Sequence, residues 1–205
     1  MGEHYTFALS VFTGFFAVMN PLANAPVFLS LAGDRSPLER QRIARSSCLV
    51  AFGIVLAFIL FGKLIFDLFG ITIPAFKVTG GILLFFTGFD MLRSQAPKAH
   101  RQEAVAPEAD DIAVSPLGIP ILAGPGTIVT AMNGVTDAGP VRIAIVVLVL
   151  GLMVGLTYLS FTLSDRLVAR VGGNLMKVFE KLLGLILAIV GTGMCMSGIK
   201  LAFAP

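Results

Sequence analysis

The chain is poor in the residues that carry most enzymatic and metal chemistry. Its 205 residues include no tryptophan, two cysteines and two histidines, and 13% are charged, against roughly 25% in a soluble domain. The sequence contains no phosphate-binding loop, no cluster of metal ligands and no nucleophile beside a base. We therefore expect no enzyme activity, no cofactor and no metal site, and the sequence disfavours an ATP-driven pump. Cys48 and Cys195 stand in apolar surroundings, which is typical of small core residues.

Long apolar stretches dominate the chain instead. Hydrophobic residues make up 56% of it, and the mean hydropathy is +0.91. Spanning a bilayer takes about 20 apolar residues, and continuous runs of that length predict helices, whereas a barrel needs alternation. Six stretches qualify and leave no room for a separate soluble domain, namely residues 6–32, 46–69, 74–92, 115–134, 143–163 and 177–203. The sequence predicts an all-α integral membrane protein with six transmembrane helices.

The sequence also contains an internal repeat. Adding 103 to a residue number in the first half gives the same residue type in the second half for Gly70 and Gly173, Gly81 and Gly184, and Gly88 and Gly191. Each half holds three apolar stretches, and an odd number of crossings inserts the second copy upside down. We expect two inverted three-helix repeats, residues 1–93 and 115–205, joined by a polar cytoplasmic linker over residues 94–114. Inverted repeats with interrupted helices are typical of secondary transporters.

The basic residues predict how the chain crosses the membrane. They gather in the loops after the first, third and fifth stretches, as Arg35, Arg40, Arg42 and Arg45, then Arg93, Lys98 and Arg101, then Arg166, Arg170 and Lys177. The positive-inside rule places these loops in the cytoplasm and both termini outside. The net charge of +3 therefore needs no nucleic-acid partner. No Lys or Arg precedes the first stretch, so we expect it to stay in the mature protein, in a prokaryotic inner membrane.

Local signals refine the predicted helices. Ser36, Pro37 and Glu39 form a capping-box pattern, which predicts a short amphipathic cytoplasmic helix leading into the second stretch. The third and sixth stretches are rich in glycine, which lets helices approach closely in lipid. Such glycines suit packing within a protomer or between protomers, so the sequence leaves a homo-oligomer open.

Two of the apolar stretches are interrupted at matching places. The first contains Asn20-Pro21-Leu22-Ala23-Asn24-Ala25-Pro26, and the fourth contains Ala123-Gly124-Pro125-Gly126-Thr127. Prolines remove backbone donors, and unsatisfied backbone groups in lipid cost several kcal/mol each. Such breaks therefore survive only where protein or a hydrated cavity faces them. One kinked helix means little, but two at repeat-related positions predict discontinuous helices that meet at mid-membrane.

The breaks have the chemistry of a site for a small zwitterion. Asn24 and Thr127 stand 103 apart and are N-cap residues by type, so we expect the second half-helices to begin near them and to offer N–H groups to an anion. Alternatively, each side chain simply caps its own helix. Unwound carbonyls near residues 20–23 and 123–126 suit an ammonium group, and the small residues there favour a small amino acid. The candidate substrate-binding residues are Asn20, Pro21, Ala23, Asn24, Gly124, Pro125, Gly126 and Thr127.

Asp90 is the candidate residue for coupling transport to an ion gradient. It lies near the predicted cytoplasmic end of the third stretch, and Arg93 follows one turn later. Carboxylates inside membrane segments often mark proton pathways, whereas an interfacial ion pair with Arg93 is the alternative. Lys77 and Glu180 occupy repeat-related positions, where snorkelling or interfacial pairing explains them.

Several motifs of the chain match a known family. They are Asn20-Pro21 with Asn24 and Pro26-Val27-Phe28-Leu29, Phe69-Gly70-Ile71 with Pro74, Gly80-Gly81, and, most specifically, Ala123-Gly124-Pro125-Gly126-Thr127-Ile128. On these residues the chain resembles the MarC family over nearly its whole length. The resemblance implies a six-helix integral membrane protein whose broken helices correspond to residues 20–26 and 123–127. It also implies a small neutral amino acid, such as glycine or alanine, as the substrate.

The leading hypothesis is a secondary transporter of small neutral amino acids, coupled to protons or another ion, in which one repeat rocks against the other around a mid-membrane site. Two alternatives stay open. One is an exporter of metabolites or toxic compounds, because gradients and coupling set the direction of transport. The other is a non-transporting membrane scaffold, which needs a large exposed surface for its partner.

Overall fold

The computed structural model of the chain describes residues 2–93, 113–136 and 138–203, and every regular element within these ranges is a helix. The predicted linker, residues 94–114, lies almost wholly outside them. The elements are α1 (Gly2–Met19), α2 (Pro21–Ala32), α3 (Pro37–Phe69), α4 (Ile73–Leu92), the π-helix η2 (Ala113–Leu122), α6 (Pro125–Val135), α7 (Pro140–Thr162), α8 (Ser164–Val171) and α9 (Gly173–Ala202).

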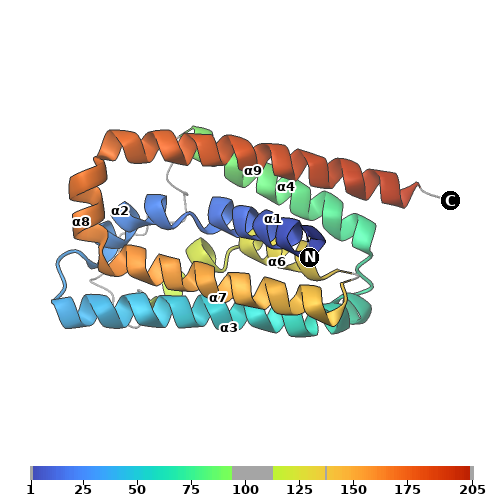
Figure 1. The fold of residues 1–205 in the computed structure, drawn as a ribbon, viewed down its shortest axis with the longest axis horizontal. Coiled ribbons are helices and arrows are strands. Elements are labelled where there is room, and N and C mark those ends of the chain that lie inside the picture. Colours follow the sequence, from blue (N-terminus) through green and yellow to red (C-terminus); the bar gives the residue numbers. More distant parts are fainter. Residues whose placement is uncertain (1, 94–112, 137, 204–205) are drawn as a thin grey trace.

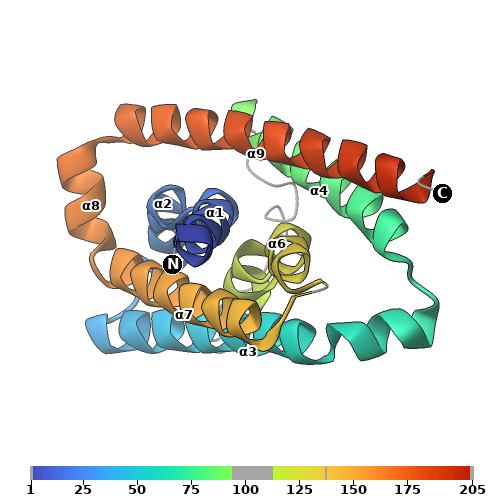
Figure 2. The same cartoon turned by 45° about the vertical axis from the view of Figure 1, so that its right-hand side comes forward.

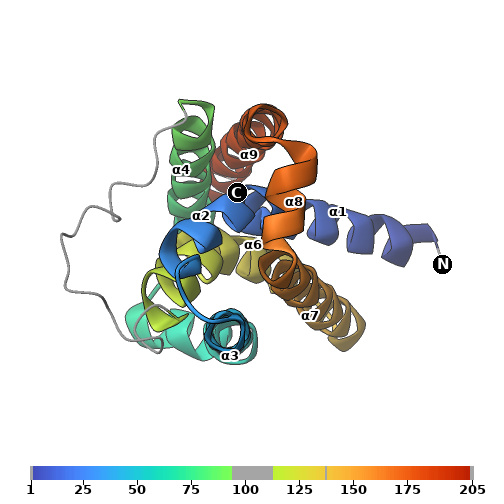
Figure 3. The same cartoon turned by 90° about the vertical axis from the view of Figure 1, so that its left-hand side faces the viewer.

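Two pairs of long helices enclose the shorter ones. α4 packs along α9 on one side of the molecule, and α3 packs against α7 on the other, with α1, α2, η2 and α6 between the pairs (Figure 2). The long axis of the molecule runs along α3, α7 and α9 (Figure 1). Seen along that direction, α2 and α6 lie near the centre of the bundle (Figure 3). Protein therefore surrounds both interrupted segments, as broken helices in a membrane require.

Five helical segments among the described residues are long and apolar enough to cross a membrane. They are Gly2–Ala32, Pro37–Phe69, Ile73–Leu92, Pro140–Thr162 and Lys177–Ala202. The predicted all-helical membrane class is thereby confirmed. The fourth predicted stretch, residues 115–134, is divided between η2 and α6, and each of these is about half the length that a bilayer needs.

The predicted capping box at the start of α3 is confirmed. The Glu39 backbone N–H donates to Ser36 Oγ at 3.3 Å, and the Ser36 backbone N–H donates to Glu39 Oε2 at 3.0 Å. α3 then continues without interruption to Phe69, so the predicted cytoplasmic helix and the second apolar stretch form one helix of 33 residues. Gly70 ends it in the left-handed conformation, with φ 61°.

α4 and α9 touch through their glycines. Gly81 lies against the backbone carbonyl of Gly191 and Gly191 against that of Gly81, so a Cβ atom at either position would come within 2.5 Å of the carbonyl oxygen. Gly88 and Gly184 face each other in the same reciprocal way. The sequence-based interpretation of these glycines as close-packing residues is therefore confirmed.

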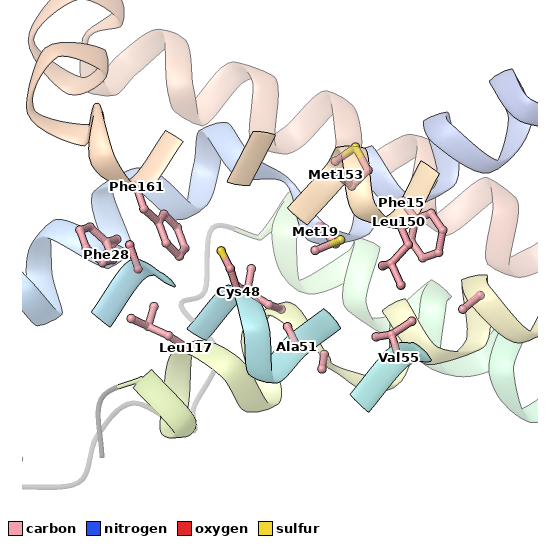
Figure 4. Packing of buried hydrophobic residues seen from close by; sticks show 14 of the residues in the cluster. Phe15, Met19, Phe28, Cys48, Ala51, Val55, Leu117, Leu150, Met153 and Phe161 are labelled. Carbon is pink, nitrogen blue, oxygen red and sulfur yellow. The ribbon is translucent and has the colours of Figure 1, made fainter. Parts of the chain in front are cut away.

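The largest hydrophobic core joins the α3–α7 pair to the interrupted segments. Phe15 and Met19 of α1 and Leu117 of η2 pack in one cluster with residues of α3 and α7, among them Cys48 and Val55 (Figure 4). Cys48 is 4% exposed, as expected for a small core residue. This cluster holds the two breaks against a common scaffold.

Candidate functional site

The first break is a single left-handed residue between two helices. α1 ends at Met19, Asn20 adopts φ 34° and ψ 70°, and α2 begins at Pro21. Asn20 is the only residue other than glycine with a positive φ among those described. Asparagine is one of the few residues that tolerate this conformation. Its Oδ1 also accepts the backbone N–H of Ala23 at 3.2 Å, which caps α2.

The second break has a different backbone. η2 ends at Leu122, and Gly124 precedes α6 with φ −69° and ψ 169°, an extended conformation open to any residue. Gly124 has no side chain to cap α6, but its carbonyl accepts the N–H groups of Thr127 and Ile128 at 3.0 and 3.1 Å. The segment before it is a π-helix, in which Ala123 N–H donates to the Gly118 carbonyl five residues back. Pro116 and Pro120 withhold two amides from this segment, which accounts for its departure from α-helical bonding.

One side-chain hydrogen bond crosses each break in the same way. Asn24 Nδ2 donates to the carbonyl of Met19 at 2.7 Å, and Thr127 Oγ1 donates to the carbonyl of Leu122 at 2.8 Å. Each donor lies five residues after its acceptor, and each acceptor is the last residue of the first half-helix. Adding 103 to Met19 and Asn24 gives Leu122 and Thr127, so the two bonds occupy equivalent places in the two halves. Each bond satisfies a carbonyl that the break leaves without its helical donor.

This arrangement corrects our prediction of where the second half-helices begin. We expected them to start near Asn24 and Thr127, and they start at Pro21 and Pro125. Proline has the φ of a helix and no N–H to lose, which makes it a favoured first residue. Asn24 and Thr127 are therefore inside their helices, and their side chains donate to carbonyls instead of capping amides.

One polar group of Asn20 lacks a hydrogen-bond partner. The residue is 3% exposed, and its side-chain Nδ2 has no hydrogen-bond partner among the described residues. The hydrogen bond from Ala23 to Oδ1 fixes the orientation of the amide, so Nδ2 is the end that lacks a partner. Buried polar groups nearly always have a partner, which can be another protein group, an ordered water or a ligand. An unpaired amide with two N–H donors suits a carboxylate or a carbonyl oxygen.

A further hydroxyl supports the first break from α7. Ser160 Oγ donates to the carbonyl of Pro21 at 2.6 Å, and Ser160 is 5% exposed. Pro26, inside α2, withholds the amide that would bond the Leu22 carbonyl. The Leu22 carbonyl is thus an acceptor without its helical donor, next to a carbonyl held by Ser160.

The first turn of α6 lies against the end of α1. A Cβ atom on Gly126 would meet Val18 Cγ1 at 3.0 Å and Leu84 Cδ2 at 3.3 Å. Thr127, the next residue, is fully buried. Gly126 therefore lies against Val18, which precedes Asn20 by two residues in the sequence. Ala23 and Asn24 lie farther along α2, and Pro125 is exposed.

A cavity extends along α1 as far as Ala17, next to this contact. It has a volume of about 740 Å³ and lies among α1, α4, α6 and α9. Its lining includes the buried Ala17 and Leu84, which adjoin Val18 and Gly126. Small-molecule sites usually have volumes of about 300–1,000 Å³. The polar lining residues are Thr6, Ser10, Thr13, Lys77, Thr130, Asn133 and Ser197.

Sequence reasoning missed this cavity. Thr6, Ser10, Thr13 and Ala17 recur at the spacing of one helix face, and that stripe of small and hydroxyl-bearing residues is the signal that could have indicated it. Lys77, which we explained by snorkelling, lines the cavity.

Side chains pack closely at the end of the bundle where α8 lies. Phe28 of α2 and Phe161 of α7 stack with ring centroids 4.6 Å apart, and both are 1% exposed (Figure 4). Beyond them Arg40, at the start of α3, makes an ion pair of 2.9 Å with Asp165 of α8. Figure 1 shows α8 at one end of the long axis and the C-terminal end of α9 at the other.

Asp90 lies on the exposed face of α4. Arg93 lies over the ring of Phe89, with its guanidinium carbon 5.4 Å from the ring centroid, in place of the ion pair offered as an alternative. Asp90 is absent from the lining of the cavity. Nowhere in the described ranges do three or more His, Cys, Asp or Glu side chains gather as they would around a metal ion.

Comparison with known proteins places the chain among membrane proteins. Residues 5–203 match the family described as MarC family integral membrane protein. The chain is 39% identical to the UPF0056 membrane protein YvbG of Bacillus subtilis, over 96% of this chain and 95% of that one. It is 33% identical to a UPF0056 membrane protein of Aquifex aeolicus, over 98% and 95% of the two chains. It is 30% identical to the UPF0056 inner membrane protein MarC of Escherichia coli, over 88% of each. No solved structure matches the chain.

Proposed function

This chain belongs to the MarC family of integral membrane proteins, and on that premise we propose that it is a secondary transporter of small neutral amino acids that binds its substrate between the two breaks. The proposal includes six transmembrane helices arranged as two inverted three-helix repeats, residues 1–93 and 115–205. It places the protein in a prokaryotic inner membrane with both termini outside.

Two reciprocal patterns support the inverted repeat. Under a two-fold axis that exchanges the repeats, each residue contacts the counterpart of its partner. Gly81 faces Gly191, the counterpart of Gly88, and Gly88 faces Gly184, the counterpart of Gly81. The side-chain bonds across the two breaks are likewise equivalent.

The observation that carries the functional proposal is the buried, unpaired amide of Asn20, three residues after Ala17, where the lining of the cavity ends on α1. A carboxylate there would accept from Asn20 Nδ2 and from the N–H of Gly126, since Pro125 has no N–H and those of Thr127 and Ile128 donate to the Gly124 carbonyl. The helix dipole at this end of α6 also favours an anion. The carbonyl of Leu22, which Pro26 deprives of a helical donor, suits the ammonium group. Unlike groups thus face the two ends of a zwitterion, and the small residues around them favour glycine or alanine.

Access to the site is proposed to alternate between the two ends of the bundle. With the termini outside, the cavity would lie on the outer side, because its lining includes Thr6 and Ser197 near the two ends of the chain. The Phe28–Phe161 stack would then close the cytoplasmic side. Since α4 and α9 come from different repeats and interlock at their glycines, we place the moving boundary around the α4–α9 pair, and not between the repeats as the sequence suggested. Asp90 belongs to that pair and stays the candidate for ion coupling.

The test compares two asparagine-to-aspartate variants in proteoliposomes. Asn20→Asp keeps the oxygen that caps α2 but replaces the unpaired N–H donors with a negative oxygen. We expect uptake of radiolabelled glycine and alanine to fall by about tenfold or more, as the loss of one charge-assisted hydrogen bond implies. Asn174→Asp makes the same change at an exposed residue at the start of α9, outside the cavity lining, and should leave uptake within about twofold of wild type.

Three outcomes would count against parts of the proposal. Equal uptake by Asn20→Asp and wild type would remove the substrate from the first break. Efflux without uptake, measured by counterflow from preloaded vesicles, would favour the exporter. An absence of any transport or ligand-induced thermal shift across a panel of amino acids would favour the scaffold.

A further inference from the structure

A second hollow lies on the outside of the bundle, away from the proposed substrate site. Its volume is about 760 Å³, and it runs between α3 and α7. The α3 side is formed by one helix face that includes Arg42, Arg45 and Leu49. The α7 side is formed by residues at the same kind of spacing, Gly151, Val154, Gly155 and Tyr158.

The hollow changes in character along its length. Arg42 and Arg45, on successive turns of α3, are exposed and carry positive charge. Tyr158 joins them at the rim, where its hydroxyl accepts a hydrogen bond from Gln41 at 3.2 Å. Its own proton has no acceptor among the described residues and can be donated to a ligand. Farther along, Leu49 and Val154 make the walls apolar.

Two glycines keep the apolar part open. A Cβ atom on Gly155 would meet nothing within 4 Å, and one on Gly151 would meet only a Phe52 ring carbon at 4.0 Å. These glycines therefore differ from those of α4 and α9, which bring backbones into contact. They leave a channel one side chain deep on the lipid-facing surface of a membrane protein.

We propose that this groove binds an anionic phospholipid, with the phosphate at Arg42, Arg45 and Tyr158 and one acyl chain along Gly151 and Gly155. Paired arginines offer the charge and the N–H groups that a phosphate needs. Basic pockets between transmembrane helices are known to hold anionic headgroups, and each basic residue there contributes measurably to binding. This proposal is independent of the transport function.

The experiment is a titration of the full chain in neutral detergent with phosphatidylglycerol or phosphatidylcholine, followed by native mass spectrometry. Wild type should bind phosphatidylglycerol in preference to phosphatidylcholine. Arg45→Gln should weaken phosphatidylglycerol binding about fivefold, which corresponds to one basic contact. Gly155→Leu should weaken it by a similar factor with every charge retained, because the new side chain occupies the acyl channel.

Matched controls separate this groove from general effects. Arg170→Gln removes an exposed charge from α8, outside the groove, and Gly53→Leu adds the same side chain at an open glycine of α3. Both should bind phosphatidylglycerol like wild type. The proposal fails if wild type shows no preference, if Arg170→Gln weakens binding as much as Arg45→Gln, or if Gly155→Leu binds normally. It also fails if soluble glycerol phosphate displaces the lipid, since the site would then recognise a free phosphate.

Discussion

At the first break the chain turns through a left-handed asparagine with a capping side chain, whereas at the second it passes through an extended glycine with none. Both breaks nevertheless return a side-chain donor to the last carbonyl of the preceding half-helix, from Asn24 and from Thr127. The two breaks thus share a side-chain donor that satisfies this backbone carbonyl. They differ in the unpaired amide of Asn20, which belongs to the first break.

A ligand whose two ends differ requires a site whose two sides differ. A two-fold related pair of identical breaks would present the same groups to both ends of a substrate. A zwitterion has one anionic and one cationic end, so its binding site must depart from the symmetry of the repeats. Asn20 and Ser160 provide that departure. Residue 57, the counterpart of Ser160 under the 103-residue step, is an alanine without a hydroxyl.

Among substitutions at the two breaks, Asn20→Ala should cause the largest loss of stability. Alanine loses the cap, at about 1 kcal/mol, and is strained in the left-handed conformation by about 1–2 kcal/mol, so we expect a loss of about 2–3 kcal/mol. Asn20→Gly keeps the backbone conformation and should cost only a few tenths. Reversible unfolding in detergent measures both. Equal losses would mean that the strain at residue 20 is absent in solution.

A smaller loss of stability is expected from removing the side-chain donors that the two breaks have in common. Thr127→Val keeps the shape of a fully buried side chain but leaves the Leu122 carbonyl without a donor, at a cost of about 1–3 kcal/mol. Thr127→Ser should recover most of the loss. Asn24→Leu should cost less, because Asn24 is only half-buried and water can replace its donor. The melting temperature of each variant in the same detergent checks this order. A larger loss for Asn24→Leu would show that the first break is the less hydrated one.

Much of this architecture could be predicted from particular residues. Pro21, Pro26, Gly124 and Pro125 in apolar stretches indicated both breaks, because proline and glycine are costly inside a membrane helix. The pattern Ser36-Pro37 with Glu39 predicted the start of α3, and the small residues Gly81 and Gly88 predicted a close helix contact. These features depend on local chemistry that a single sequence carries.

The details of the site could not be predicted in the same way. Two signals competed for each half-helix start, since Asn24 and Thr127 favour N-caps while Pro21 and Pro125 favour first positions, and the prolines prevailed. That Asn20 Nδ2 lacks a partner depends on which side chains surround it in three dimensions. The cavity likewise requires α1, α4, α6 and α9 to be placed together.

The smallest loss of stability is expected from removing the hydroxyl by which α7 supports the first break. Ser160→Ala removes the hydroxyl that donates to the Pro21 carbonyl, and we expect a loss of about 1 kcal/mol, typical of one hydrogen bond. Thr157 is the matched control, because it is fully buried on the same helix but donates to the Met153 carbonyl within α7. That carbonyl is four residues back, where it has a helical donor as well, so Thr157→Val should cost only a few tenths. Chemical unfolding of both variants compares them directly. Equal losses would assign the role of Ser160 to packing within α7, and the asymmetry between the breaks would then rest on Asn20 alone.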